Sequence, residues 1–137
     1  MERVFNSFNE LLDFNFSELE PSKTNYLRLI PADGELPIVR KEFERDMRLS
    51  EENDKSLPQI TLEICPTWLT VIIYEHAYAK RKEFELPYRN GYYDSEYLKD
   101  LIQKIFEDQK PGWGFLTWFF LFNIFDYSKQ ILIRASY

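Results

Sequence analysis

Two segments of this chain are apolar on both faces of a potential strand, and they constrain the fold more than any other feature. Residues 68–74 are apolar except for Thr70, and residues 115–125 form an eleven-residue run interrupted only by Thr117 and Asn123. A half-buried strand alternates apolar and polar side chains, whereas a strand buried on both faces is apolar throughout. A sheet with such strands at its centre needs cover on both faces, from helices on opposite sides or from another chain. If both helices pack on one face, we expect the other face to be an interface.

The segments around these runs predict further strands. Residues 25–30 are predicted to form a short strand, and residues 60–64 and 84–88 place apolar side chains at every second position. Residues 31–34, Pro-Ala-Asp-Gly, supply the turn chemistry for a hairpin after the first of these strands. The spacing within residues 36–49 fits both a strand and a helix, and intrinsic propensity favours the helix. We predict a strand there, because the preceding Asp-Gly turn favours an antiparallel return.

Helical periodicity occurs near the N-terminus and again after residue 93. Apolar residues at i, i+4, i+7 and i+8 predict a helix over residues 2–12. A second apolar stripe, behind a capping residue at position 94 or 95, predicts a helix over about 94–109. The apolar run 115–125 and a last segment beginning at Ile131 are predicted to be two C-terminal strands.

The order of these elements predicts the fold class. One helix, a cluster of strands, a second helix and two more strands, without regular βαβ alternation, indicate an α+β fold with a mainly antiparallel sheet. The chain has 137 residues, 45% of them hydrophobic, which is the size and composition of one globular domain. No linker-like stretch or internal repeat divides it, so residues 1–137 are predicted to form a single domain.

The inventory of reactive side chains is sparse. The chain has one cysteine, Cys65, and one histidine, His76, and a strand between them would hold them roughly 30 Å apart. That distance disfavours a Cys–His dyad, and one ligand of each kind cannot supply a structural zinc site. The four glycines match neither phosphate-binding loop pattern. We therefore expect a protein without catalytic residues, bound metal or cofactor.

Charge and cysteine usage constrain the partners and the compartment. The net charge of −6 argues against nucleic acid and anionic membranes, which both require a basic face. The longest apolar run has eleven residues, whereas a bilayer span needs about 20. The lone cysteine indicates a reducing compartment, and the N-terminus lacks signal-peptide features, so a cytoplasmic location is expected. The single basic run, residues 80–82, is interpreted as a solvated turn rather than a phosphate site.

An acidic stretch is the first candidate binding site. All of the excess acidity lies in residues 1–64, which hold 8 basic and 14 acidic side chains. Its densest part comprises Glu42, Glu44, Asp46, Glu51, Glu52 and Asp54. Such a field speeds the encounter with a basic protein. The alternative is an acidic loop that only maintains solubility.

A tyrosine-rich turn is the second candidate. Four residues flank or form it, Tyr88, Arg89, Tyr92 and Tyr93, and Trp113 follows nearby in the sequence. Tyr, Trp and Arg are enriched in the residues that dominate binding energy at interfaces. The alternative is that these rings close the edge of the core and keep only their hydroxyl groups in water.

These observations predict a non-catalytic protein-binding module: a small acidic cytoplasmic inhibitor that neutralises a basic protein. In size and charge the chain is similar to bacterial toxin-neutralising immunity proteins, and this likeness implies a toxin as the partner. Two alternatives stay open. One is a small enzyme that uses carboxylates and tyrosines, with Glu75 and His76 as the first candidates. The other is a homodimeric structural protein joined through an aromatic sheet face.

Overall fold

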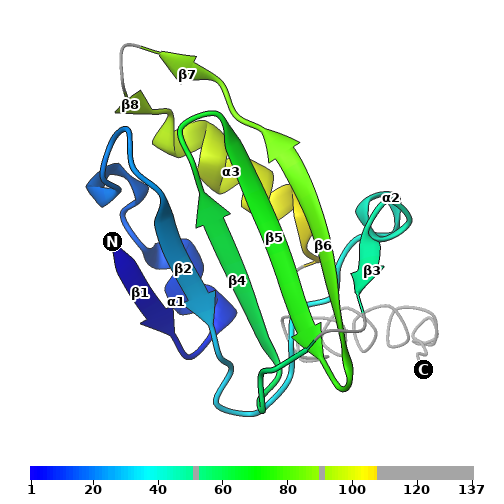
Figure 1. The fold of residues 1–137 in the computed structure, drawn as a ribbon. Helices are drawn as coiled ribbons and strands as arrows, with labels where there is room; N and C mark the ends of the chain where they lie inside the picture. Colours follow the sequence, from blue (N-terminus) through cyan, green and yellow to red (C-terminus); the bar gives the residue numbers. More distant parts are fainter. Residues whose placement is uncertain (51–52, 90–91, 108–137) are drawn as a thin grey trace, which may run out of the picture.

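The computed structural model describes residues 1–50, 53–89 and 92–107, and a six-stranded sheet forms its main layer (Figure 1). The strand order is β1-β2-β4-β5-β6-β3. The strands are β1 (Glu2–Phe5), β2 (Asn25–Leu29), β3 (Arg48–Ser50), β4 (Gln59–Ile64), β5 (Trp68–Glu75) and β6 (Tyr78–Glu85). β1 runs parallel to β2, and the other neighbouring strands are antiparallel. The α+β class is therefore confirmed, with a mixed sheet.

Short helices and one separate strand pair complete the described part of the chain. The helices are α1 (Phe8–Asp13), the 3-10 helix η1 (Phe16–Glu18), α2 (Lys41–Glu44) and α3 (Ser95–Ile105). β7 (Tyr88–Arg89) and β8 (Tyr92–Tyr93) form a two-stranded ladder of their own. Within the described residues, no helix is long and apolar enough to cross a membrane.

The helices α1 and α3 both lie on one face of the sheet, behind it in the view of Figure 1. We call this the covered face, and it carries the hydrophobic core. Its most deeply buried side chains come from α1, β2, β4, β5 and α3, and they include Leu11, Leu27, Leu29, Ile60, Leu62, Ile64, Leu69, Val71, Leu98, Ile102 and Ile105. Burial of each such side chain stabilises the fold by about 1.5–3 kcal/mol.

The opposite face, which we call the open face, has no described helix over it (Figure 1). Its side chains follow the strand register in rows across the sheet. One row contains Glu2, Tyr26, Glu63, Thr70 and Glu83, and the next contains Val4, Arg28, Thr61, Ile72, Arg81 and Arg48. Thr70 and Ile72 are nevertheless buried, because the longer side chains around them exclude water. Both helices thus pack on one face, the condition under which the sequence predicts an interface on the other.

The predicted N-terminal helix over residues 2–12 is wrong in its first half. Residues 2–5 form β1, and α1 begins only at Phe8. Ser7 ends the strand and caps the helix, because its hydroxyl group accepts a hydrogen bond from the Glu10 amide at 3.1 Å. The Glu10 carboxylate in turn accepts one from the Asn6 amide at 3.1 Å. This reciprocal capping fixes the boundary.

The strand predicted over residues 36–49 is also wrong for most of its length. Residues 41–44 form α2, Val39 makes an isolated bridge with Phe106, and Arg48–Ser50 form a strand only at the end of the segment, at the far edge of the sheet beside β6. The turn over residues 31–34 does form, with Gly34 at a φ of +77°, but no hairpin with β2 follows, because β1 and β4 occupy both of its edges. Helix propensity and the packing of Phe43 against Phe84, at 5.6 Å between ring centroids, favour α2.

Several other predictions have clear outcomes. β2, β4 and β5 lie where alternation and apolarity predicted them, and β5 is central, between β4 and β6. α3 begins behind Asp94, whose carboxylate accepts a hydrogen bond from the Tyr97 amide at 3.0 Å. Residues 80–82 are not a turn but the middle of β6, where the lysines make ion pairs. The strands predicted over 115–125 and from Ile131 lie outside the described residues.

Candidate functional site

Two members of the acidic stretch, Glu44 and Asp46, are neutralised within the fold. The Glu44 carboxylate pairs with the Lys80 ammonium group at 2.5 Å, and Asp46 pairs with Lys82 at 3.4 Å. The hydrogen bond to Glu44 raises the pKa of Lys80 above its ordinary value, against an opposing effect of burial. These two carboxylates attach α2 and the segment after it to β6, so their charge is already compensated.

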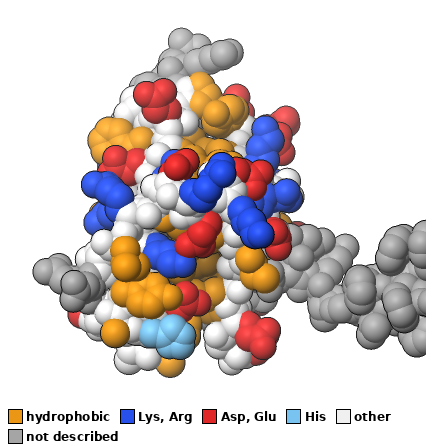
Figure 2. Space-filling view, turned by 90° about the vertical axis from the view of Figure 1, so that its right-hand side faces the viewer, with side chains coloured by type: hydrophobic (Ala, Val, Ile, Leu, Met, Phe, Trp, Pro, Cys, Tyr) orange, Lys and Arg blue, Asp and Glu red, His pale blue; other side chains and the backbone are white. Residues whose placement is uncertain are grey.

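The remaining members of this stretch are dispersed. Glu42 is exposed and forms no ion pair with a described residue, whereas Glu51 and Glu52 lie outside the described residues. Asp54 lines a hollow on the open face. Figure 2 views the side of the molecule that carries β6, and acidic and basic side chains are interspersed there. The structure therefore does not gather the four described members of the stretch, Glu42, Glu44, Asp46 and Asp54, into one acidic surface.

The tyrosine-rich turn is described only in its backbone. Tyr88 lies opposite Tyr93, and Arg89 lies opposite Tyr92, in the β7–β8 ladder. The side chains of these four residues, and the whole of Trp113, lie outside what the structure describes. Whether the turn is a binding surface therefore stays a prediction.

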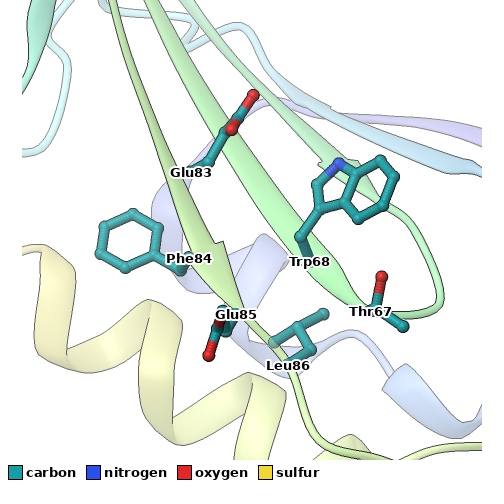
Figure 3. Close-up of a pocket in the computed structure, with 6 residues that line it drawn as sticks. All are labelled: Thr67, Trp68, Glu83, Phe84, Glu85 and Leu86. Atoms are coloured by element: carbon teal, nitrogen blue, oxygen red, sulfur yellow. The ribbon is translucent and has the colours of Figure 1, made fainter.

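A different site lies at the end of β5 and β6, where Trp68 is 45% exposed (Figure 3). The hollow beside it has a volume of about 500 Å³ and is lined by Thr67, Trp68, Glu83, Phe84, Glu85 and Leu86. Trp68 lies directly opposite Glu85 in the register, and Glu83 is on the same face two residues earlier. Phe84 points the other way, toward α3 (Figure 3). Trp68, Glu83 and Glu85 are the residues we call the tryptophan–glutamate site.

The two carboxylates of this site differ from those of the acidic stretch. Neither Glu83 nor Glu85 forms an ion pair or side-chain hydrogen bond with any residue that the structure describes, and both are exposed. Glu63 lies in the same row of the open face, separated from Glu83 only by Thr70. No described residue forms an ion pair with Glu63, Glu83 or Glu85, so this end of the open face has negative charge that the described part of the chain does not neutralise.

The combination of an exposed indole ring and free carboxylates suits a cationic ligand. The face of a tryptophan ring attracts an ammonium or guanidinium group, and a carboxylate beside it forms a charge-assisted hydrogen bond to the same group. Exposed pairs of this kind are worth about 0–1 kcal/mol each, so affinity requires several contacts at once. The site therefore fits a lysine or arginine side chain presented by a larger molecule.

The second hollow, of about 470 Å³, lies on the same face near the turn that joins β5 to β6. It is lined by Ser50, Asn53, Asp54, Ile72, Tyr74, Ala79 and Arg81. Burial raises the pKa of Tyr74 above its ordinary value, and the nearby Asp54 carboxylate raises it further. His76 lies in the turn itself and Cys65 precedes the other end of β5. No group of residues suited to holding a metal ion occurs in the described part of the chain.

Sequence reasoning did not select Trp68, Glu83 or Glu85, although a signal for them is present. A two-residue turn at His76 and Ala77 fixes the register of the β5–β6 hairpin. That register places Trp68 against Glu85 and turns every second residue of β6 away from the core. The interpretation of residues 80–82 as a turn shortened β6 and concealed this pairing.

Comparison of the chain with protein-family models, with curated proteins and with solved structures finds no match.

Proposed function

We propose that this chain is a non-catalytic protein-binding module that takes a basic protein on the open face of its sheet. In its specific form, the module is a small acidic cytoplasmic inhibitor of the immunity type, which neutralises a partner such as a toxin. The net charge of −6 favours encounter with a basic partner, and the single cysteine is compatible with a reducing compartment.

The tryptophan–glutamate site is the observation that carries this proposal. It joins an exposed large aromatic side chain, Trp68, to two carboxylates that no described residue neutralises. Large aromatic anchors beside polar groups are typical of the residues that dominate binding at protein interfaces. Within the acidic stretch, Glu44 and Asp46 contribute to the fold, because they are already paired with β6.

A homodimer through the open face is the second candidate, and one observation favours it. The row with Glu63 and Glu83 is acidic, and the adjacent row with Arg28, Arg81 and Arg48 is basic. A two-fold axis between these rows would place the acidic row of one copy against the basic row of the other. The enzyme alternative has weaker support, since neither hollow is lined by Glu75 or His76.

The proposal is tested by comparing the wild-type chain with two variants in capture from lysate of the cells that make it. The first variant is Glu83→Gln/Glu85→Gln, and the matched control is Glu42→Gln, which removes an exposed carboxylate outside the site. We expect wild type and control to retain one basic protein that the double variant loses. With that protein purified, the dissociation constant of the double variant should be about tenfold higher, a change of about 1.4 kcal/mol.

Two results would contradict the proposal. One is capture of the same protein, with the same affinity, by all three chains. The other is the absence of any retained basic protein. Sedimentation of the free chain separates the homodimer, since a monomer at high micromolar concentration excludes it.

A further inference from the structure

β6 leaves half of its outer edge unpaired among the described strands. β3 pairs only with Ala79, Lys80 and Arg81, so no described strand pairs with the segment from Lys82 to Glu85 on that side. The nearest described element there is α2 (Figure 1), which contacts the segment through side chains, Phe43 against Phe84. The chain before β3 turns into α2, and the Asp46 and Met47 amides donate to carbonyl groups of that helix segment, at 3.1 and 3.2 Å. They are therefore not available to extend the ladder.

The register shows which backbone groups face this edge. The Leu86 amide donates to the Thr67 carbonyl group at 2.8 Å, so Leu86 faces β5. Orientation alternates along an antiparallel strand, so Lys82 and Phe84 also face β5. The N–H and C=O groups of Glu83 and Glu85 consequently point outward, and they form no hydrogen bond to a described residue outside the strands. These are also the two residues whose carboxylates belong to the tryptophan–glutamate site.

We infer that the partner binds by adding an extended segment, antiparallel, to the outer edge of β6 at Lys82–Glu85. This inference rests on the proposed function and names its binding mode. Backbone hydrogen bonds to Glu83 and Glu85 hold the segment, and side-chain contacts select it. Residues opposite Glu83 and Glu85 share their face and are basic. The residue of the partner segment between these two basic residues is apolar, because it lies beside Phe84. Phe84 itself is half-buried against Phe43.

Charge selects a basic segment over a second copy of this chain. An antiparallel pair of two identical β6 edges centred on Phe84 would place Glu83 of one copy directly opposite Glu85 of the other. Like charges in directly opposed positions destabilise a strand pair. A segment that alternates lysine and valine instead places an ammonium group opposite each carboxylate and an aliphatic side chain beside Phe84.

A blocked heptapeptide of alternating lysine and valine is the probe, titrated into the full chain and followed by hydrogen exchange and amide chemical shifts. In the free chain the Glu83 and Glu85 amides should exchange fast, and those of Lys82 and Phe84 slowly. On binding, the first two should become protected. Methylation of the backbone amide nitrogens of the lysine residues removes the hydrogen bonds to β6 and should weaken binding about tenfold or more. Methylation of the backbone amide nitrogens of the valines, which face away from β6, should change the affinity little.

A variant of the chain provides the reciprocal test. Proline is tolerated where a strand N–H points away from the sheet, so Glu83→Pro keeps the β5–β6 ladder and blocks the outer edge. We expect the dissociation constant of the peptide to be about tenfold higher for Glu83→Pro than for Glu83→Gln. The amide chemical shifts of β4 and β5 should be the same as in wild type. If Glu83→Pro fails to fold, the comparison of the two methylated peptides on wild-type protein decides instead.

The inference and the proposed function fail differently. Equal binding of both methylated peptides, or no binding at millimolar peptide, would overturn strand addition. If either of these results were found and Glu83→Gln/Glu85→Gln still failed to retain the basic protein partner, strand addition would be wrong and the proposed function would still be supported. Sedimentation of the chain as an edge-to-edge dimer with protected Glu83 and Glu85 amides would show that a second copy occupies the edge, and would also overturn the inference.

Discussion

The two faces of the sheet are built from the same strands and differ in nearly everything else. The covered face supplies Leu27, Leu62 and Leu69, all of which are fully buried under α1 and α3. The open face supplies threonine and charged residues with Trp68, which is 45% exposed. Burial of apolar area stabilises the fold, whereas exposed aromatic and charged groups contribute little to stability and much to recognition. The comparison therefore separates the residues that hold the molecule together from those available for binding.

The largest expected effect is on the covered face. Leu69 is 0% exposed, and Leu69→Ala should lower the free energy of unfolding by about 2–5 kcal/mol, because it removes buried surface and leaves a cavity. Urea unfolding followed by circular dichroism measures the change. Val4→Ala on the open face, where the side chain is 59% exposed, is the control and should stay within about 0.5 kcal/mol. Similar losses in both variants would contradict the division between the faces.

The next effect concerns a polar residue on the covered face. Asn25 is 0% exposed, and its side chain accepts a hydrogen bond from the Glu20 amide at 3.1 Å and donates to the Glu20 and Lys23 carbonyl groups. Asn25→Ala should cost about 1–3 kcal/mol, because these backbone groups lose their partner. The measurement is the same urea titration, with Asn9→Ala, an exposed asparagine of α1, for comparison. An unchanged midpoint would show that water replaces the side chain.

The covered face could be predicted from the sequence more completely than the edges of the sheet. Alternation and apolarity located β4 and β5, and the cap at Asp94 located α3, because these signals are local. β1 was missed because its pairing is with β2, more than 20 residues away, and its four residues also fit a helical stripe. α2 was missed because it has four residues and depends on contacts with β6.

The candidate site was less predictable, because charge in the sequence does not show which charges are compensated. Glu44 and Asp46 lie in the densest acidic stretch, yet lysines of β6 neutralise them. Glu83 and Glu85 follow a basic run and looked balanced by it. In β6, however, the register places the lysines on the covered side with Phe84 and the glutamates on the open side with Trp68. The period of two along a strand separates neighbours in sequence.

A smaller effect is expected for the aromatic residue of the open face. Trp68→Ala removes a larger side chain than Leu69→Ala does, yet it should lower the free energy of unfolding by less than about 1 kcal/mol, because much of the ring is already in water. The two neighbours on β5 thus form a matched pair. The same variant should lose affinity for the basic partner. A loss of stability as large as that of Leu69→Ala would place Trp68 in the core and remove the aromatic component of the proposed site.

The smallest effect is on the charges that border the open face. The Arg28 guanidinium group donates a hydrogen bond to the Glu2 carboxylate at 2.9 Å, which holds the pKa of Glu2 below its ordinary value of 4.5. In the unfolded chain Glu2 titrates near the ordinary value, so the pair stabilises the fold above about pH 4.5. That stabilisation is lost as the pH falls through the lowered pKa of the folded chain.

When the pH is lowered from 7 to 3, the unfolding midpoint should therefore fall less in Glu2→Gln than in wild type. In 1 M salt the two chains should differ less, because salt screens the ion pair. The Glu42 carboxylate forms no ion pair with a described residue, so in Glu42→Gln the midpoint should fall between pH 7 and pH 3 by as much as in wild type. An equal fall of the midpoint in wild type, Glu2→Gln and Glu42→Gln would mean that the Arg28–Glu2 pair contributes nothing measurable to stability at this exposed edge. The stabilising contribution of the open face would then come from its buried side chains, among them Thr61, Thr70 and Ile72, rather than from this ion pair.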